Sequence, residues 1–92
     1  MAKVVFTDAA RRSLTEVLTY IAQDNPQAAL DLIDDLQTRI VGTLSLFPDA
    51  GAILAGPRRV MTVRRYAVVY RYDRARDEAV VLDVFGPGMD WR

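Results

Sequence analysis

Apolar residues in the first half of the chain recur every three or four positions, which is the spacing of one face of an α-helix. Two sets have this spacing: Ala10, Leu14, Val17, Leu18 and Ile21, followed by Ala29, Ile33, Leu36, Ile40, Leu44 and Phe47. They predict helices over about 8–23 and 26–46. Asn25 is a good N-cap, proline suits the first helical position, and Pro48 ends the second helix. Because the connection between them is short, the two helices should form an antiparallel hairpin.

The hydrophobic pattern changes in the second half of the chain to the period of two that is typical of β-strands. Strands rich in β-branched and aromatic residues are predicted over 60–64, 67–72 and 79–85, and a short apolar strand over 4–6 precedes the helices. Arg64 and Arg65 should form a tight turn. The segment 47–57 contains two prolines and two glycines and is predicted to be a loop. In the last strand, alternation directs three residues toward the helices: Val80, Leu82 and Val84.

The order of these elements is β-α-α-β-β-β, which indicates the α+β class. We expect a single domain over 1–92, in which an antiparallel sheet is packed on one side by the two-helix hairpin. Such a sheet has apolar residues on both faces but helices for only one of them. The apolar surface that the helices leave uncovered predicts either a partner that covers the second face or an exposed groove.

The composition excludes several classes of protein and site. Of the 92 residues, 51% are hydrophobic and 26% are charged, which is typical of a folded domain and not of a disordered chain. The absence of cysteine and histidine removes disulfides, thiolate metal sites and the usual general base, so we predict no metal site. No apolar stretch approaches the roughly 20 residues of a membrane span, and the N-terminus lacks a secretory signal. We therefore expect a cytoplasmic protein that does not enter a membrane.

Positive charge is concentrated in one stretch, although the whole chain is formally neutral. Between 58 and 76 there are seven arginines and a single acidic residue, Asp73. The guanidinium group is a planar fork of donors that suits phosphate and carboxylate groups, so this stretch predicts a surface that binds anions. The alternative interpretation is a charged sheet edge that keeps the protein soluble.

Four short motifs, in order along nearly the whole chain, resemble those of RelE/ParE toxins. They are Asp8 followed by Tyr20-Ile21-Ala22, Asn25-Pro26 and Ala28-Ala29; Leu46-Phe47-Pro48-Asp49 with Gly51; 64–72 (RRYAVVYRY); and 80–85 (VVLDVF). The resemblance implies a RelE/ParE-like fold and a small bacterial toxin of a type II toxin–antitoxin system. It further implies an antitoxin protein that neutralises the toxin, a role in plasmid stabilisation or stress, and no cofactor.

The family contains two kinds of toxin, and the residues of this chain favour one of them. Ribonuclease-type members cleave messenger RNA in the ribosome, which requires a base to accept the proton of the 2′-hydroxyl and cations to hold the phosphate. They commonly carry an arginine directly after the tyrosine of the middle strand, and His, Tyr or basic residues after the last strand. Here these positions hold Ala67 and 86–90 (GPGMD).

We therefore expect no catalytic residue and inhibition of DNA gyrase by binding, as in ParE-type members. Two alternatives stay open. One is a ribosome-dependent messenger RNA endoribonuclease with Arg58, Arg59 and Arg71 as its phosphate clamp. The other is a non-catalytic nucleic-acid-binding module.

Two sets of candidate contact residues follow from this hypothesis. Basic and terminal residues are candidates for binding the target: Arg58, Arg59, Arg64, Arg65, Arg71, Trp91 and Arg92. Apolar and aromatic residues of the hairpin and the outer strands are candidates for binding the antitoxin: Leu14, Leu18, Tyr20, Tyr66, Tyr70, Val81 and Phe85. Direct contact with nucleic acid stays open.

Overall fold

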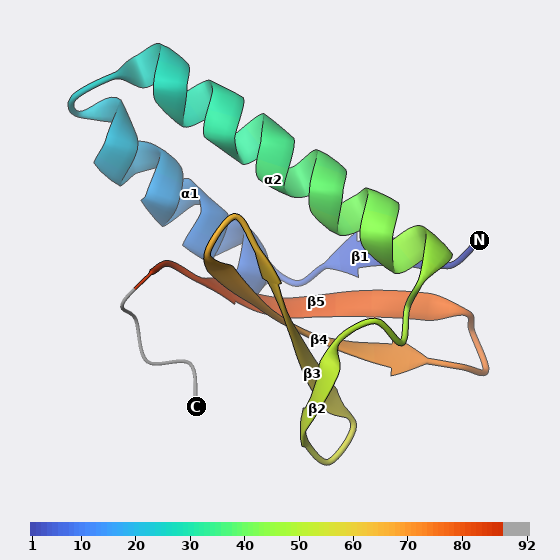
Figure 1. The fold of residues 1–92 in the computed structure, drawn as a ribbon. Coiled ribbons are helices and arrows are strands. Elements are labelled where there is room, and N and C mark those ends of the chain that lie inside the picture. The colour runs from blue at the N-terminus through green and yellow to red at the C-terminus, as the bar shows by residue number, and fades with distance from the viewer. Residues whose placement is uncertain (88–92) are drawn as a thin grey trace.

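Two helices and five strands make up the computed structural model, which describes residues 1–87 (Figure 1). In chain order they are β1 (Lys3–Phe6), α1 (Asp8–Ala22), α2 (Pro26–Leu46), β2 (Ala52–Ala55), β3 (Arg58–Val63), β4 (Tyr66–Asp73) and β5 (Glu78–Phe85). The predicted α+β class is confirmed, and α2 spans the residues that the sequence predicts. One element differs, because β2 is a strand within the segment predicted to be a loop.

Side chains before each helix cap its first turn. The Thr7 hydroxyl accepts a hydrogen bond from the Ala10 amide (3.1 Å) and donates one to the Leu82 carbonyl oxygen (3.0 Å). The cap of α1 therefore also ties this helix to β5. At the start of α2, the Asn25 side chain accepts a hydrogen bond from the Ala28 amide (3.0 Å). Within residues 1–87, neither helix has the length and apolar character needed to cross a membrane.

The five strands form one sheet in the order β1-β5-β4-β3-β2. Strands β2 to β5 are antiparallel neighbours in sequence order. The edge strand β1 pairs with β5 in parallel, because the chain passes through the helical hairpin and the meander before it returns beside β1. The predicted antiparallel sheet is therefore present, with one parallel edge that the sequence did not indicate.

Both helices lie on the same side of the sheet, and the core lies between these two layers (Figure 1). Buried residues of both helices and of β3, β4 and β5 form it: Ala10, Leu14, Leu36, Ile40, Leu44, Val63, Val68, Tyr70, Ala79, Val81 and Val84. Side chains alternate across a strand, so the residues between these positions belong to the opposite side of the sheet. We call that side the second face, and it includes Arg58, Val60, Val69, Arg71 and Val80.

A β-bulge in the β4–β5 pair changes which side chains of β5 face the helices. The register of the pair shifts between Val69 and Tyr70. Three residues of β5 consequently belong to the core: Ala79, Val81 and Val84. The prediction for Val84 is confirmed, but the prediction that Val80 and Leu82 face the helices is wrong, because simple alternation does not continue through a bulge.

Candidate functional site

Two arginines lie opposite each other on the second face of the sheet, and we call them the arginine pair. Arg58 in β3 and Arg71 in β4 are direct partners in the antiparallel register. Tyr70, the neighbour of Arg71, is in the core, so alternation directs Arg71 to the side that carries no helix. Arg58 is exposed, whereas Arg71 is half-buried next to the buried residues Val69 and Val80.

The arginine pair lies beside two carboxylates of the same face, Asp73 in β4 and its β5 partner Glu78, but forms no ion pair with either of them. Within residues 1–87, neither member forms an ion pair, in contrast to four other arginines: Arg39, Arg59, Arg64 and Arg74. The next residue of β4 on the same face, Asp73, accepts a hydrogen bond from the Arg76 backbone amide (3.2 Å). Like charges directly opposite each other in a sheet are destabilising. The pair is therefore a concentrated positive site that a bound anion would stabilise.

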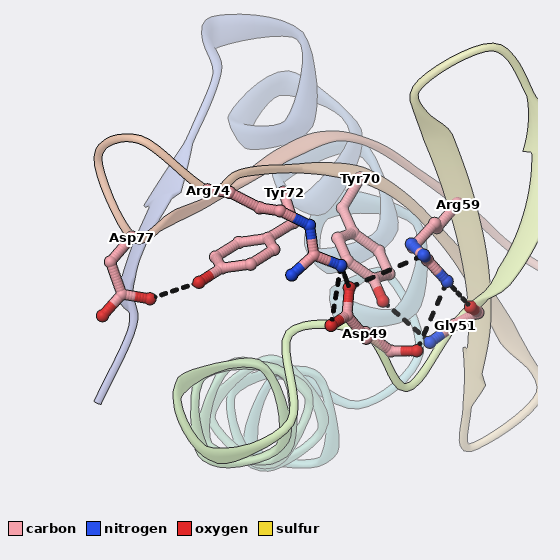
Figure 2. Close-up of polar contacts among 7 residues, drawn as sticks. All are labelled: Asp49, Gly51, Arg59, Tyr70, Tyr72, Arg74 and Asp77. Atoms are coloured by element: carbon pink, nitrogen blue, oxygen red, sulfur yellow. Dashed lines mark hydrogen bonds and ion pairs between the residues drawn. The ribbon is translucent and has the colours of Figure 1, made fainter.

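Arg59 follows Arg58 in the sequence but lies on the helix side of β3, where it holds the loop between α2 and β2 (Figure 2). Its guanidinium group donates to the carbonyl oxygens of Gly51 (2.8 Å) and Asp49 (3.4 Å) and forms an ion pair with the Asp49 carboxylate (3.5 Å). Arg74 reaches the same carboxylate from the β4–β5 loop, at 3.0 and 3.1 Å from its two oxygens. Arg59 is thus engaged within the molecule, unlike Arg58.

A buried hydrogen bond holds the same loop from inside the molecule (Figure 2). The Gly51 amide donates to the hydroxyl of Tyr70 (2.7 Å), which is fully buried. A Cβ atom at position 51 would lie 2.7 Å from the Tyr70 ring and hydroxyl and 2.9 Å from the Val60 carbonyl oxygen, so the site requires glycine. Together with the contacts of Asp49, this bond gives the motif over 46–51 a structural role.

Within the described residues, the tyrosines near the arginine pair are not suited to accept a proton at neutral pH. An effective general base has a pKa near the working pH. The chain has no histidine. Burial raises the pKa of Tyr70, and the hydrogen bond that Tyr72 donates to Asp77 (2.5 Å) raises the pKa of Tyr72, so both hydroxyls stay protonated. Asp83 accepts a hydrogen bond from Ser13 (2.5 Å) and lies opposite Val69 in the register.

Metal ligation is also not indicated in this part of the chain. Among residues 1–87, no three acidic, cysteine or histidine side chains are grouped so that they could hold a metal ion. The arrangement around the arginine pair can therefore bind an anion.

Arg64 and Arg65 lie at the other end of the β3–β4 hairpin. Both have positive φ angles (48° and 71°), as in a type I′ turn, so the predicted tight turn is confirmed. The six residues of β3 separate this turn from the arginine pair by roughly 20 Å. Arg64 forms an ion pair with Asp35 (3.1 Å). Trp91 and Arg92 lie outside the described residues. The described target-binding candidates therefore fall in separate places: Arg58 and Arg71 share one face of the sheet, and Arg64 and Arg65 lie in the turn.

The residues predicted to bind an antitoxin also separate. Three of them lie in the core, where a partner cannot reach them: Leu14, Tyr70 and Val81. Three are half-buried: Leu18, Tyr66 and Phe85. The seventh, Tyr20, is 76% exposed and lines, with Tyr66, a groove of about 400 Å³ between α1 and the end of the sheet. The prediction that these three residues contact a partner is therefore corrected, since their side chains are buried inside the molecule.

One exposed apolar region contains none of the predicted contact residues. Leu46 and Phe47 are 60% and 65% exposed at the end of α2, and they line a second groove of about 520 Å³ between α2 and β3. The helical period assigned Phe47 to the buried face. The helix ends one residue earlier, at Leu46, so Phe47 no longer follows that period. The position of Phe47 directly before Pro48 indicates that the helix ends there and that Phe47 can leave the buried face.

Comparison with known families identifies the group to which this arrangement belongs. A family model described as the ParE toxin of the type II toxin–antitoxin system parDE matches residues 4–91. The chain belongs to the ParE toxin family. This ParE-family chain is thus a toxin of a type II toxin–antitoxin system. No curated protein sequence matches it.

Solved structures share the fold of this ParE-family chain at low sequence identity. A chain of the chromosomal ParDE system from P. aeruginosa superposes with a TM-score of 0.76 at 19% identity, covering 95% of this chain and 97% of the other. A chain of the RelBE2 complex from Mycobacterium tuberculosis gives 0.69 at 23% identity, covering 96% and 93%. The isolated RelE toxin of E. coli gives 0.68 at 14% identity, covering 99% and 89%. These values show a common fold for ParE-type and RelE-type toxins.

Proposed function

We propose that this chain inhibits DNA gyrase by binding the gyrase–DNA complex, and that a cognate antitoxin neutralises it. The observation that carries the proposal is the pair formed by Arg58 and Arg71. It is a positive site without an ion-pair partner within residues 1–87. Such a site can bind an anionic surface, and a chain without histidine lacks the usual general base for hydrolysis. Inhibition by binding requires only that the toxin has a higher affinity for one state of its target than for the others.

Hydrolysis of RNA is the alternative, and the environment of Ala67 argues against it. Ala67 follows Tyr66 in β4, where ribonuclease-type members resembling this chain commonly have an arginine. It is only 6% exposed, on the second face of the sheet. The position therefore provides neither a cation for the phosphate nor room for one without displacing its neighbours.

A supercoiling assay with purified gyrase tests the proposal. The wild-type chain should inhibit supercoiling, and the double variant Arg58→Gln/Arg71→Gln should lose most of this inhibition. The matched control is Arg12→Gln, which removes an exposed arginine of α1 that forms no ion pair within residues 1–87. This control should inhibit as strongly as the wild type. Full gyrase activity in the presence of excess wild-type chain would overturn the proposal.

Primer extension on messenger RNA, after expression of the chain in cells, separates the two mechanisms. We expect intact transcripts together with blocked supercoiling. Discrete cuts near codon boundaries that disappear in the double variant would instead assign the chain to the ribonuclease type.

The antitoxin is the second part of the proposal. The similar structures include the intact RelBE toxin–antitoxin complex of E. coli. This chain exposes Tyr20, Leu46 and Phe47 beside two grooves, which an amphipathic antitoxin segment would cover. Co-expression of the product of the adjacent reading frame should restore growth and gyrase activity in the cytoplasm. A chain that is monomeric and harmless when expressed alone would contradict this.

A further inference from the structure

We propose that Arg58 and Arg71 together bind a single phosphate group of a DNA backbone. The inference rests on the proposed function only for the source of the DNA, which would be the segment held by gyrase. The site itself is defined by two features of the sheet: the register that places the two arginines opposite each other, and the absence of an ion pair to either of them within residues 1–87.

The register brings both side chains within reach of one anion. Directly opposed residues of an antiparallel pair have Cβ atoms only about 4.5–5.5 Å apart. Both side chains leave the same face of the sheet, because cross-strand partners share a face. Each guanidinium group offers a planar fork of donors that matches two oxygens of a phosphate. Two such forks can therefore hold one phosphate from two sides.

The surroundings of Arg71 strengthen the attraction for an anion. Val69 precedes it by two residues on the same face and is 3% exposed, and its β5 partner Val80 is 6% exposed. The stem of Arg71 thus starts from an apolar part of the sheet, where the effective dielectric constant is lower than in water. Arg58 is exposed and leaves access from solvent. Arg71 thus provides a partly desolvated cation, and Arg58 leaves the site open to solvent. This arrangement suits a phosphate group that is attached to a large molecule such as DNA.

The repulsion within the pair also favours a bound anion. Without a ligand, two like charges face each other across the strands, which destabilises the sheet locally. An anion between them replaces this repulsion by two attractions. Four arginines, Arg39, Arg59, Arg64 and Arg74, have a carboxylate partner. Arg58 and Arg71 have none within residues 1–87 and also face each other across two strands. Among the described residues, no carboxylate forms an ion pair that would compete with an external anion for these two cations.

Binding of a labelled DNA duplex, without gyrase and at several salt concentrations, tests this directly. Binding of the wild-type chain should weaken as the salt concentration rises. Loss of one phosphate contact should reduce the slope of log K against log salt by about 0.9. Arg58→Gln and Arg71→Gln should each show this decrease and bind about tenfold more weakly. Arg12→Gln should have the slope and affinity of the wild type.

The double variant tests whether the two arginines share a phosphate. If they do, Arg58→Gln/Arg71→Gln should bind little more weakly than either single variant, because the same contact is already lost. A double variant whose loss equals the product of the two single losses would overturn the shared site. Equal losses in the single variants and in Arg12→Gln would overturn it as well, since the binding would then follow net charge alone.

Thermal unfolding in inorganic phosphate provides a control for folding. Each single variant removes the repulsion, so its midpoint without phosphate should be no lower than that of the wild type. Phosphate should raise the midpoint of the wild type and of Arg12→Gln more than that of either single variant. A site that responds to inorganic phosphate while the variants bind DNA like the wild type would be a free-phosphate site, which overturns the DNA assignment.

These outcomes are separate from those of the proposed function. If DNA binding is unaffected in the variants but the wild-type chain inhibits gyrase, the phosphate site is wrong and the gyrase proposal stands. If the variants lose DNA binding but the wild-type chain leaves gyrase fully active, the phosphate site stands and the gyrase proposal is wrong.

Discussion

Removal of one hydroxyl group from the core should destabilise this protein measurably. The Tyr70 hydroxyl accepts the hydrogen bond of the Gly51 amide at 2.7 Å, in a buried position. Tyr70→Phe keeps the ring and its packing but leaves the Gly51 amide without this acceptor. A buried donor that loses its only acceptor costs about 1–3 kcal/mol, which is more than the net value of an ordinary hydrogen bond.

The size of this effect is well within reach of standard measurements. For a domain of this length, each kcal/mol of lost stability lowers the thermal midpoint by roughly 4–8 °C. Guanidinium unfolding monitored by circular dichroism should show a lower midpoint at an unchanged slope, because the surface exposed on unfolding stays the same. Thermal unfolding provides an independent value of the same loss.

Tyr72→Phe is the matched control, since it removes the same atom two residues further along β4. The Tyr72 hydroxyl donates to Asp77 in an exposed contact. Its loss should leave the unfolding midpoint close to that of the wild type, because water replaces the acceptor. If Tyr70→Phe were as stable as Tyr72→Phe, the Gly51 bond would not stabilise the loop, and the structural role assigned to the motif over 46–51 would be refuted.

Three further predictions concern the same loop and the β3–β4 turn. Gly51→Ala should destabilise the fold more than Tyr70→Phe in guanidinium unfolding, because the added methyl group meets both the Tyr70 ring and the Val60 carbonyl oxygen. Burial raises the folded-state pKa of Tyr70 above 10, so its contribution to stability is complete below pH 10 and is lost as the pH rises through the folded pKa. A pH series of unfolding midpoints should therefore show a smaller alkaline loss for Tyr70→Phe than for the wild type. Arg65→Gly should raise the midpoint, because a φ of 71° costs arginine about 1 kcal/mol that glycine avoids; a lower midpoint would contradict this.

The helices could be predicted from the sequence because their ends carry strong local determinants. Asn25 and Pro26 begin α2, and Pro48 follows its last turn closely, so the predicted and observed bounds agree. Strand β2 lacks such determinants. Its four residues, AILA, contain two alanines and a single β-branched residue, and Ile53 is 72% exposed at the sheet edge. Pairing with β3 makes this segment a strand, and pairing is not a local property of the sequence.

The facing of side chains in β5 was the least predictable feature. Alternation is reliable only while the register is regular, and the bulge opposite Val69 and Tyr70 interrupts it. The β3–β4 register is different, because a two-residue turn at Arg64 and Arg65 fixes it. Each residue before such a turn pairs with the residue at the same distance after it, which places Arg58 opposite Arg71. The predicted turn was therefore sufficient to place Arg58 opposite Arg71. It did not indicate that Arg59 would bind the loop between α2 and β2.

The consecutive residues Arg58 and Arg59 show how one strand can serve both stability and binding. The pleat sends them to opposite faces of β3, and their β4 partners Arg71 and Tyr70 are divided in the same way. Arg59 and Tyr70 hold the loop that precedes β2, whereas Arg58 and Arg71 have no ion-pair partner within residues 1–87. Substitutions at Arg59 or Tyr70 should therefore lower stability first, and substitutions at Arg58 or Arg71 should lower binding without lowering stability. This separation allows loss of function to be distinguished from loss of folding within a single strand pair.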